Sequence, residues 1–400
     1  MRPTRGRSGH GCHNLKRCGE ALCLTMTTDP SSSVVHLTMR RGKHPLAVGS
    51  GVLYERNGQH YIATAWHNLS GRHSESLRPL SDKGGVPDNV VAIVPQVVSS
   101  HVGPGLIRTP FTLPVETDSQ TLYLVHPVGW PRIDVAVLPI DPEAVFEQEM
   151  HVSNGRDIVM PGRMRNGVNP SGVSTDIQPI QRCAGAHARL TVPPDALVHA
   201  GDDLFVLGYP KGIADFSAAP IWKRATVASD PNVGWNRQPK FLIDCASREG
   251  MSGAPVIAYH KNGRIHFGTS SVASAGPAAL LHGIYVGRIV DNEVSKEDRF
   301  FEAQIGTVWK RLVIDEIIDG QVPALHSSLV GAPPKAVDQA VREKWPDDPA
   351  YFLKILAVSE YRSGMTQVAL EHLNGNADPR LVYEAVIAYA RELDSQAKPG

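Results

Sequence analysis

The sequence has 400 residues, and its 40 lysine and arginine side chains are balanced by 40 aspartate and glutamate side chains. This zero formal net charge gives no reason to expect a nucleic acid or an anionic membrane surface as a partner. The chain holds no run of about 18 apolar residues, so no transmembrane helix is expected. Its length suggests two or three domains.

Residues 1–33 differ in composition from the rest of the chain. Arginine, glycine and serine are frequent in them, and the apolar stretch at 21–26 is too short for the core of a secretion signal. We therefore expect a disordered basic tail over residues 1–33, without an export signal. Met26 offers an alternative start.

Cysteine usage is low. Three of the five cysteines lie in the first 23 residues, and a histidine follows the first of them. These side chains could be read as a metal cluster, but no C-x-x-C spacing supports it, so neither a metal nor a cofactor is expected. The cysteines also do not make a disulfide framework. A chain poor in disulfides fits a reducing compartment, and we expect a cytoplasmic protein.

The first half of the chain reads as a series of short β-rich runs separated by Gly, Pro, Asn and Asp. The expected strands cover residues 34–39, 46–54, 60–65, 90–98, 121–125 and 133–140. Strands at this spacing, with no helical periodicity, indicate an antiparallel barrel, which we assign to residues 34–150. The third run leads into His67, and the last begins at Asp134.

A second strand-rich half covers residues 151–320. The expected strands are 188–192, 203–207, 221–228, 240–244, 254–260, 264–270 and 281–290. An Asn-Gly pair at 262–263 predicts a hairpin between two of them. Residues 303–319 carry apolar side chains at helical spacing, so a helix is expected to pack back on this second barrel.

Residues 330–400 alternate alanine, leucine and charged residues in helix-like segments. This pattern predicts a helical C-terminal region. It is either a packing extension of the second barrel or a module that binds a protein partner.

A glycine-flanked serine, Ser252, stands out in the second half. Serine is a poor nucleophile near neutral pH unless a base takes its proton, and an imidazole oriented by a carboxylate can do so. His67 and Asp134 precede Ser252, an order that differs from the orders in α/β-hydrolases and subtilisins. The backbone N–H groups of Gly250 and Ser252 would stabilise an oxyanion.

Four blocks carry a resemblance to a known family: residues 64–67 (Thr-Ala-Trp-His), 134–138 (Asp-Val-Ala-Val-Leu), 201–212 and 250–255 (Gly-Met-Ser-Gly-Ala-Pro). Together they resemble the signature blocks of chymotrypsin-fold (trypsin-like) serine peptidases, of the bacterial trypsin-like domain type. The likeness runs from about residue 34 to about residue 289. It implies two six-stranded antiparallel β-barrels with the active site in the cleft between them.

The same resemblance implies where the specificity pocket lies. Ala246, six residues before the nucleophile, would form the pocket floor, Arg248 would lie nearby, and Ser271 would line the wall. With no acid at Ala246, we expect small or apolar P1 residues rather than basic ones.

Two functions from different classes fit this pattern. The preferred one is a serine endopeptidase acting on a protein or peptide substrate, with His67 as general base, Asp134 as its partner and Ser252 as nucleophile. The alternative is a regulatory or interaction protein on the same fold, whose helical tail binds a partner and in which proteolysis is minor or conditional.

Overall fold

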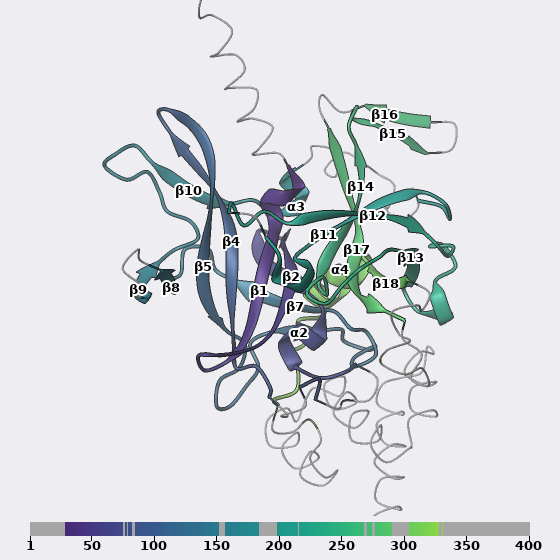
Figure 1. The fold of residues 1–400 in the computed structure, drawn as a ribbon, viewed down its shortest axis with the longest axis horizontal. Helices are drawn as coiled ribbons and strands as arrows, with labels where there is room; N and C mark the ends of the chain where they lie inside the picture. Colours follow the sequence, from purple (N-terminus) through teal and green to yellow (C-terminus); the bar gives the residue numbers. More distant parts are fainter. Residues whose placement is uncertain are drawn as a thin grey trace, which may run out of the picture.

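The computed structural model describes residues 29–74, 77, 79–81, 85–151, 157–183, 198–214, 216–267, 270–273, 277–289, 304–327 and 330. β-Strands dominate these residues and form a ten-stranded sheet in the first half, a closed six-stranded barrel in the second and a separate two-stranded sheet. Figure 1 shows the sheet, purple to blue, beside the barrel, teal to green. Among the described residues, no helix has both the length and the apolar character needed to cross a membrane.

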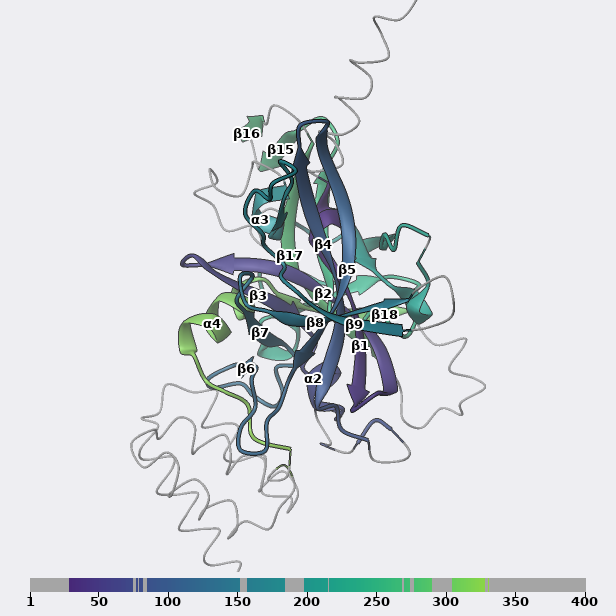
Figure 2. The same ribbon diagram turned by 90° about the vertical axis from the view of Figure 1, so that its left-hand side faces the viewer.

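The sheet of the first half has the order β6-β7-β3-β2-β1-β4-β5-β8-β9, and β10 pairs with β4. Its strands are β1 (Val34–Arg41), β2 (His44–Arg56), β3 (Gln59–Thr64), β4 (Asn89–Ser100), β5 (Gly103–Pro114), β6 (Leu124–Val125), β7 (Ala136–Ile140), β8 (Phe146–His151), β9 (Asp157–Gly162) and β10 (Ser174–Ile177). The long β4–β5 hairpin is conspicuous in Figure 2.

The described hydrogen bonds do not close the first half into the barrel predicted for residues 34–150. The strands β6 and β9 lie at the two ends of the sheet and do not pair with each other. β6 has only two residues, and its free edge needs partners for its backbone groups. The segment after the last helix supplies them. The Val125 N–H donates to Val322 O (2.9 Å), and the Ala324 N–H donates to Tyr123 O (3.0 Å).

The boundary between the halves also lies later than predicted. β9 and β10 follow residue 151 yet belong to the first sheet. At the other end, Pro30–Ser33 forms the short 3-10 helix η1, in which Ser32 and Ser33 are buried, although these residues were assigned to the tail.

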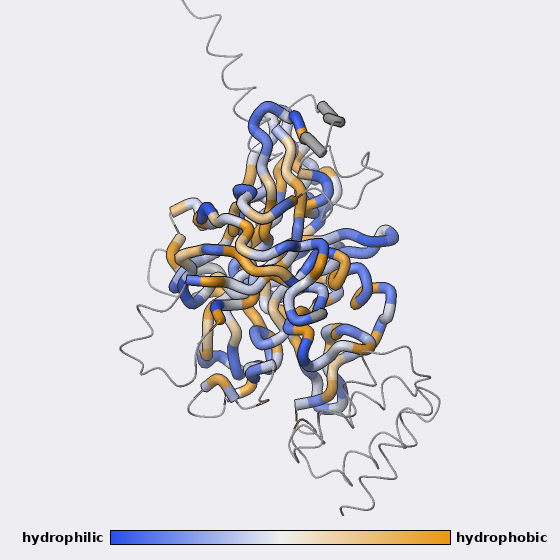
Figure 3. Tube along the Cα trace, turned by 90° about the vertical axis from the view of Figure 1, so that its right-hand side faces the viewer, coloured by the Kyte–Doolittle hydropathy of each residue, from blue (hydrophilic) through white to orange (hydrophobic). Residues whose placement is uncertain are grey.

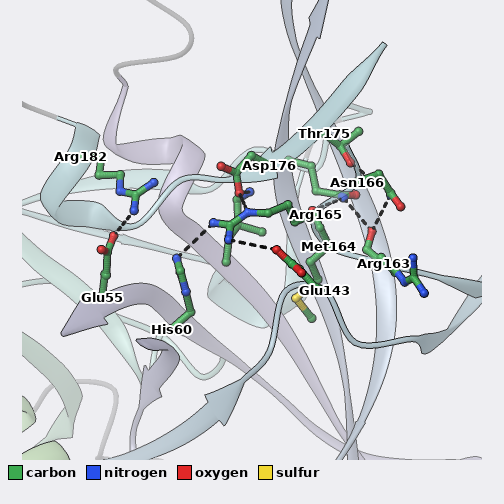
Figure 4. Close-up of polar contacts among 12 residues, drawn as sticks. Glu55, His60, Glu143, Arg163, Met164, Arg165, Asn166, Thr175, Asp176 and Arg182 are labelled. Atoms are coloured by element: carbon green, nitrogen blue, oxygen red, sulfur yellow. Dashed lines mark hydrogen bonds and ion pairs between the residues drawn. The ribbon is translucent and has the colours of Figure 1, made fainter. Parts of the chain in front are cut away.

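Polar contacts tie the segment after β9 to the first sheet (Figure 4). Arg165 pairs with Asp176 at 2.7 Å, and Arg182 pairs with Glu55 at 2.5 Å. Burial and the neighbouring Arg165 guanidinium lower the pKa of His60, which keeps this imidazole neutral at physiological pH. Residues up to Arg182 therefore still belong to the first half.

The barrel has the closed order β11-β12-β13-β18-β17-β14. Its strands are β11 (Asp203–Gly208), β12 (Ile221–Val227), β13 (Lys240–Asp244), β14 (Ala254–His260), β17 (Ala278–Arg288) and β18 (Ile305–Lys310). The short helices of the chain are η1 (Pro30–Ser33), α2 (Trp66–Ser70), α3 (Ile180–Cys183), η4 (Pro210–Gly212) and η5 (Trp235–Arg237), and the longest described one is α4 (Leu312–Gly320).

Two predictions for this half were wrong. The helix expected over 303–319 is a strand in its first part, because β18 pairs with both β13 and β17 and closes the barrel. The strand expected at 264–270 does not pair with β14, which pairs with β17 instead. It forms β15 (Arg264–Phe267) in a separate two-stranded sheet with β16 (Ser270–Ala273). The predicted tail over residues 1–28, the strand at 188–192 and the helices after residue 330 lie outside the described residues.

Apolar side chains of both halves meet in one shared core. It joins residues of the first sheet, such as Tyr61, to barrel residues, such as Leu281, and to Ile314 and Ile317 of α4. Figure 3 shows hydrophobic segments gathered in the middle of the molecule and hydrophilic ones at the hairpin tips. This core fixes the two halves against each other and so positions the segments that carry His67 and Ser252.

Candidate active site

His67 lies in α2, directly after β3, where Asp134 holds it by two hydrogen bonds. The His67 backbone N–H donates to Asp134 Oδ1 (2.9 Å), and the distance from His67 Nδ1 to Asp134 Oδ2 is 2.7 Å. An ionised carboxylate only accepts hydrogen bonds, so the proton belongs on Nδ1 and Nε2 is left as the basic nitrogen. The structure therefore brings together two of the residues singled out from the sequence.

The pKa of His67 reflects two opposing effects. Burial lowers it, because the protonated ring loses its hydration, but the negative charge and hydrogen bond of Asp134 raise it. The effects of Asp134 outweigh the effect of burial, and the pKa of His67 lies above its ordinary value of 6.5. The pair therefore favours an imidazolium once His67 has accepted a proton.

The turn that carries Ser252 is pressed against the first half of the chain. Gly253 has φ +88°, and a Cβ on it would collide with Ser50 O and Thr64 Oγ1. The Ser252 carbonyl accepts hydrogen bonds from the Ser50 N–H and from Asn68 Nδ2, both at 2.8 Å. Glycine is therefore needed at 253 for this contact between the halves.

The Ser252 hydroxyl forms no hydrogen bond with His67 in this structure. It donates to Val286 O at 3.1 Å, and no described residue forms a hydrogen bond with His67 Nε2. Ser252 and His67 thus lie on neighbouring segments, since Asn68 bonds directly to the Ser252 carbonyl. Catalytic hydrogen bonds in enzymes without substrate are often longer or differently directed than in the complex.

The two predicted oxyanion donors are directed by the backbone around Gly250. The Glu249 carbonyl accepts from the Lys211 N–H at 2.6 Å, so the Gly250 N–H at the other side of the same planar peptide points the opposite way. The Ser50 hydroxyl donates to Gly250 O at 2.8 Å. Within the described part of the chain, no acceptor binds the N–H of Gly250 or of Ser252.

Two of the residues predicted for the specificity pocket, Ala246 and Arg248, lie shortly before Ser252. Ala246 is exposed, and Arg248 is half-buried and donates to Ser247 O at 2.8 Å. Ser271 lies in β16, whose backbone pairs with β15 away from the barrel ladder. Neither Ala246 nor Arg248 lines the cavity next to His67.

That cavity has a volume of about 450 Å³ and is bounded by both His67 and Asp134. Val286, whose carbonyl holds the Ser252 hydroxyl, also lines it. Its other prominent side chains were not predicted from the sequence and come from separate elements: Arg132, Trp235, Lys240, Arg288 and Trp309. No local motif connects them, so only the fold could reveal the group.

Ser50 and Asn68 were missed as well. Ser50 is fully buried, and its hydroxyl links the Gly250 carbonyl to the Tyr209 N–H at 3.1 Å. Asn68 Nδ2 also donates to Thr64 Oγ1 at 2.9 Å. One signal was present for Ser50, since glycines flank it on both sides and allow another chain segment to approach closely.

Comparison with known proteins gives only distant similarity. No family model matches the sequence, and no curated protein matches it. Solved serine proteases share the β-rich architecture at low scores. The serine endoprotease from Yersinia pestis is 14% identical with a TM-score of 0.32, and the match covers 72% of this chain and 62% of that one. The chain thus spans less than two thirds of the length of that enzyme.

Two further structures are similar at the same level. The active form of a protease from M. tuberculosis is 12% identical with a TM-score of 0.31, covering 82% of this chain and 97% of that one. The protease Anisep from Arthrobacter nicotinovorans is 13% identical with a TM-score of 0.34, covering 72% and 95%. At this distance the similarities carry no argument about activity, which has to rest on the geometry of the site.

Proposed function

We propose that this chain is a serine endopeptidase that hydrolyses peptide bonds through His67, Asp134 and Ser252. The observation that supports it is the pair of hydrogen bonds that His67 donates to Asp134, which leaves Nε2 basic in a segment that contacts the turn carrying Ser252. A histidine with a structural role only would not need this orientation next to a glycine-flanked serine.

Turnover begins when the Ser252 hydroxyl leaves Val286 O and donates to His67 Nε2. The Ser252 oxygen attacks the peptide carbonyl while His67 takes its proton, and Asp134 stabilises the imidazolium. The N–H groups of Gly250 and Ser252 bind the oxyanion. His67 then protonates the leaving amine, and water hydrolyses the acyl-enzyme by the same route.

The peptide backbone has a place to bind at the end of β17. β14 pairs with β17 only as far as Tyr285, whereas β18 pairs on to Arg288. One edge of residues 286–288 therefore has no strand partner among the described residues, and an extended peptide can add to it as a further strand. Because Val286 O contacts the Ser252 hydroxyl, a peptide bound here runs past the nucleophile.

Labelling with a fluorophosphonate probe tests this proposal. We expect the wild-type protein to be labelled at Ser252 and Ser252→Ala to be unlabelled. Ser171→Ala, at an exposed serine in the loop before β10, is the matched control and should be labelled like the wild type. Labelling that persists in Ser252→Ala, or is missing from the folded wild type, would reject the proposal.

A further inference from the structure

The cavity beside His67 is lined by three cationic side chains. Arg132 precedes Asp134 by two positions, Lys240 begins β13, and Arg288 ends β17. All three are half-buried. The only carboxylate among the described lining residues is Asp134, and it is already bound to His67. The cavity therefore carries an excess of positive charge in a chain whose overall charge is balanced.

Two of these cations have no carboxylate partner in the described part of the chain, namely Arg132 and Arg288. Several other arginines are neutralised at 2.5–2.7 Å: Arg40 by Glu149, Arg56 by Asp319, Arg165 by Asp176, and Arg224 by Asp203. A guanidinium that is partly buried and has no counter-ion attracts an anion from outside the protein.

The walls of the cavity suit a small acidic side chain. Trp309 is almost fully buried, and Trp235 from η5 faces the same space. Lys240 Nζ lies 5.1 Å from the Trp309 ring centroid, a cation–π contact that holds this ammonium at the cavity wall. Tryptophan surfaces can cover the methylene groups of a glutamate or aspartate while arginine binds its carboxylate in a bidentate manner.

We propose that this cavity is a subsite for an acidic side chain of the peptide substrate, at one of the positions P2 to P4. The inference rests on the proposed peptidase function. The acidic side chain of the substrate is assigned to a position other than P1, because Ala246, at the predicted floor of the P1 pocket, does not line the cavity. Residues 286–288, which offer the edge for the peptide backbone, do line it.

Matched fluorogenic peptides test the subsite. The peptides differ only in having Glu, Gln or Lys at P2, P3 or P4, with the P1 residue kept small. At one of these positions, kcat/KM for Glu should exceed that for Gln on the order of tenfold or more, since hydrogen bonds to charged groups are the stronger ones. The Lys peptide should be the poorest. Salt of about 1 M should reduce the preference by screening.

Variants identify the residues responsible. Arg132→Gln should bring the Glu/Gln ratio toward one while kcat/KM for the Gln peptide changes little, and Arg288→Gln should also bring this ratio toward one. Arg264→Gln is the matched control, because Arg264 is exposed in β15, at the opposite end of the molecule from α2 in Figure 1, and should keep the wild-type ratio. An unchanged ratio in both cavity variants would overturn the assignment.

Two readouts separate failure of the subsite from failure of the peptidase proposal. If Ser252 is labelled by the fluorophosphonate but Glu and Gln peptides are cleaved equally, the subsite is wrong and the peptidase function stands. If no labelling occurs, the peptidase function fails. Fluorescence anisotropy of the same peptides with Ser252→Ala then measures the subsite without turnover, and equal Kd values for Glu and Gln would reject it.

Discussion

Asp134 sets the pH dependence of His67 by working against burial. His67 must be neutral to accept a proton, so kcat/KM should rise with pH around a midpoint above 6.5, because the pKa of His67 is raised. In Asp134→Asn the charge is lost and burial remains, so the midpoint should move to lower pH. A pH profile of kcat/KM with one peptide measures both. A midpoint that moves upward in Asp134→Asn would contradict this account.

The same raised pKa has a consequence for stability with a definite sign. The folded protein binds the His67 proton more tightly than the unfolded chain does, so the pair contributes stability that is fully present below pH 6.5. That contribution is lost as pH rises through the folded pKa. The optimum for activity and the optimum for this part of the stability therefore lie on opposite sides of the His67 titration.

Ser252 and His67 should act as one unit in catalysis. We expect Ser252→Ala and His67→Ala each to lower kcat on the order of 10⁶-fold, and the double variant to be no worse than either. Asp134→Asn should cost less, on the order of 10⁴-fold, because the geometry survives with the wrong tautomer. Thermal unfolding serves as the control for folding. Additive losses in the double variant would count against a shared proton transfer.

At the scale of elements, the turn around Ser252 is held by the close approach of β2 and β3. Gly253→Ala should destabilise the fold, because the residue has φ +88° and its Cβ would collide with Ser50 O. Gly58→Ala is the matched control, since Gly58 has φ +76° but an added Cβ there meets nothing within 4 Å. We expect Gly253→Ala to lose about 1–3 kcal/mol more unfolding free energy than Gly58→Ala in urea titrations. Equal losses of unfolding free energy in the two variants would mean that the positive φ accounts for the effect and that the collision of the Cβ contributes nothing.

Helix α4 is anchored to the first half through Asp315. Tyr54 Oη donates to Asp315 Oδ1 at 2.7 Å, and Arg311 pairs with the other carboxylate oxygen at 2.6 Å. Burial, together with the Asp315 charge, raises the pKa of Tyr54 to about 12. The phenol therefore stays protonated and keeps donating to Asp315 across the physiological range.

Asp315→Ala should therefore be costly, because it leaves the partly buried Tyr54 and Arg311 groups without their acceptor. We expect a loss of about 1–3 kcal/mol in unfolding free energy. Asp319→Ala is the comparison, since Asp319 pairs with Arg56 on the surface, and this substitution should cost less than Asp315→Ala. A larger effect at Asp319 than at Asp315 would reverse this ranking.

Element types were more predictable than their connections. The strands expected at 240–244 and 254–260 match β13 and β14 residue for residue, because short apolar runs bounded by turn residues are local signals. The failure at 303–319 has a tertiary cause, since two neighbouring strands recruit β18 into the barrel and override a helical pattern. The predicted hairpin around Gly263 failed for a similar reason. The turn forms, with the Gly263 N–H donating to His260 O at 3.0 Å, but β17 takes the place beside β14.

At the scale of the whole molecule, the site is divided between the halves, and only part of it has a sequence signal. His67 and Asp134 stand in recognisable blocks, and the structure joins them. Ser50 and Asn68 hold the Ser252 turn through hydrogen bonds to residues that lie about 200 positions away in the sequence. Arg132, Lys240 and Arg288 meet only once the barrel has closed. The triad roles, the cytoplasmic location and the function of residues 331–400 stay predictions from the sequence.

The chain crosses back from the barrel to the first half after α4. Val322, Ala324 and Leu325 are buried there, and the Ser327 hydroxyl donates to Glu116 at 2.6 Å. This segment covers the free edge of β6, close to β7, the strand that follows Asp134. The first half is therefore not complete until the last described segment of the chain is in place.

A pair of shortened chains tests this dependence. A protein that ends after Gly320 lacks the covering segment, whereas one that ends after Val330 retains it. Burying a valine or leucine side chain contributes about 1.5–3 kcal/mol, so the shorter chain should lose several kcal/mol relative to the longer one, with a lower midpoint in urea unfolding. Fluorophosphonate labelling of Ser252 should also be weaker in the shorter chain. Without the covering segment, the first half no longer holds the His67–Asp134 pair against the Ser252 turn. Equal stability of the two chains would show that the barrel and the first sheet hold the site without this segment.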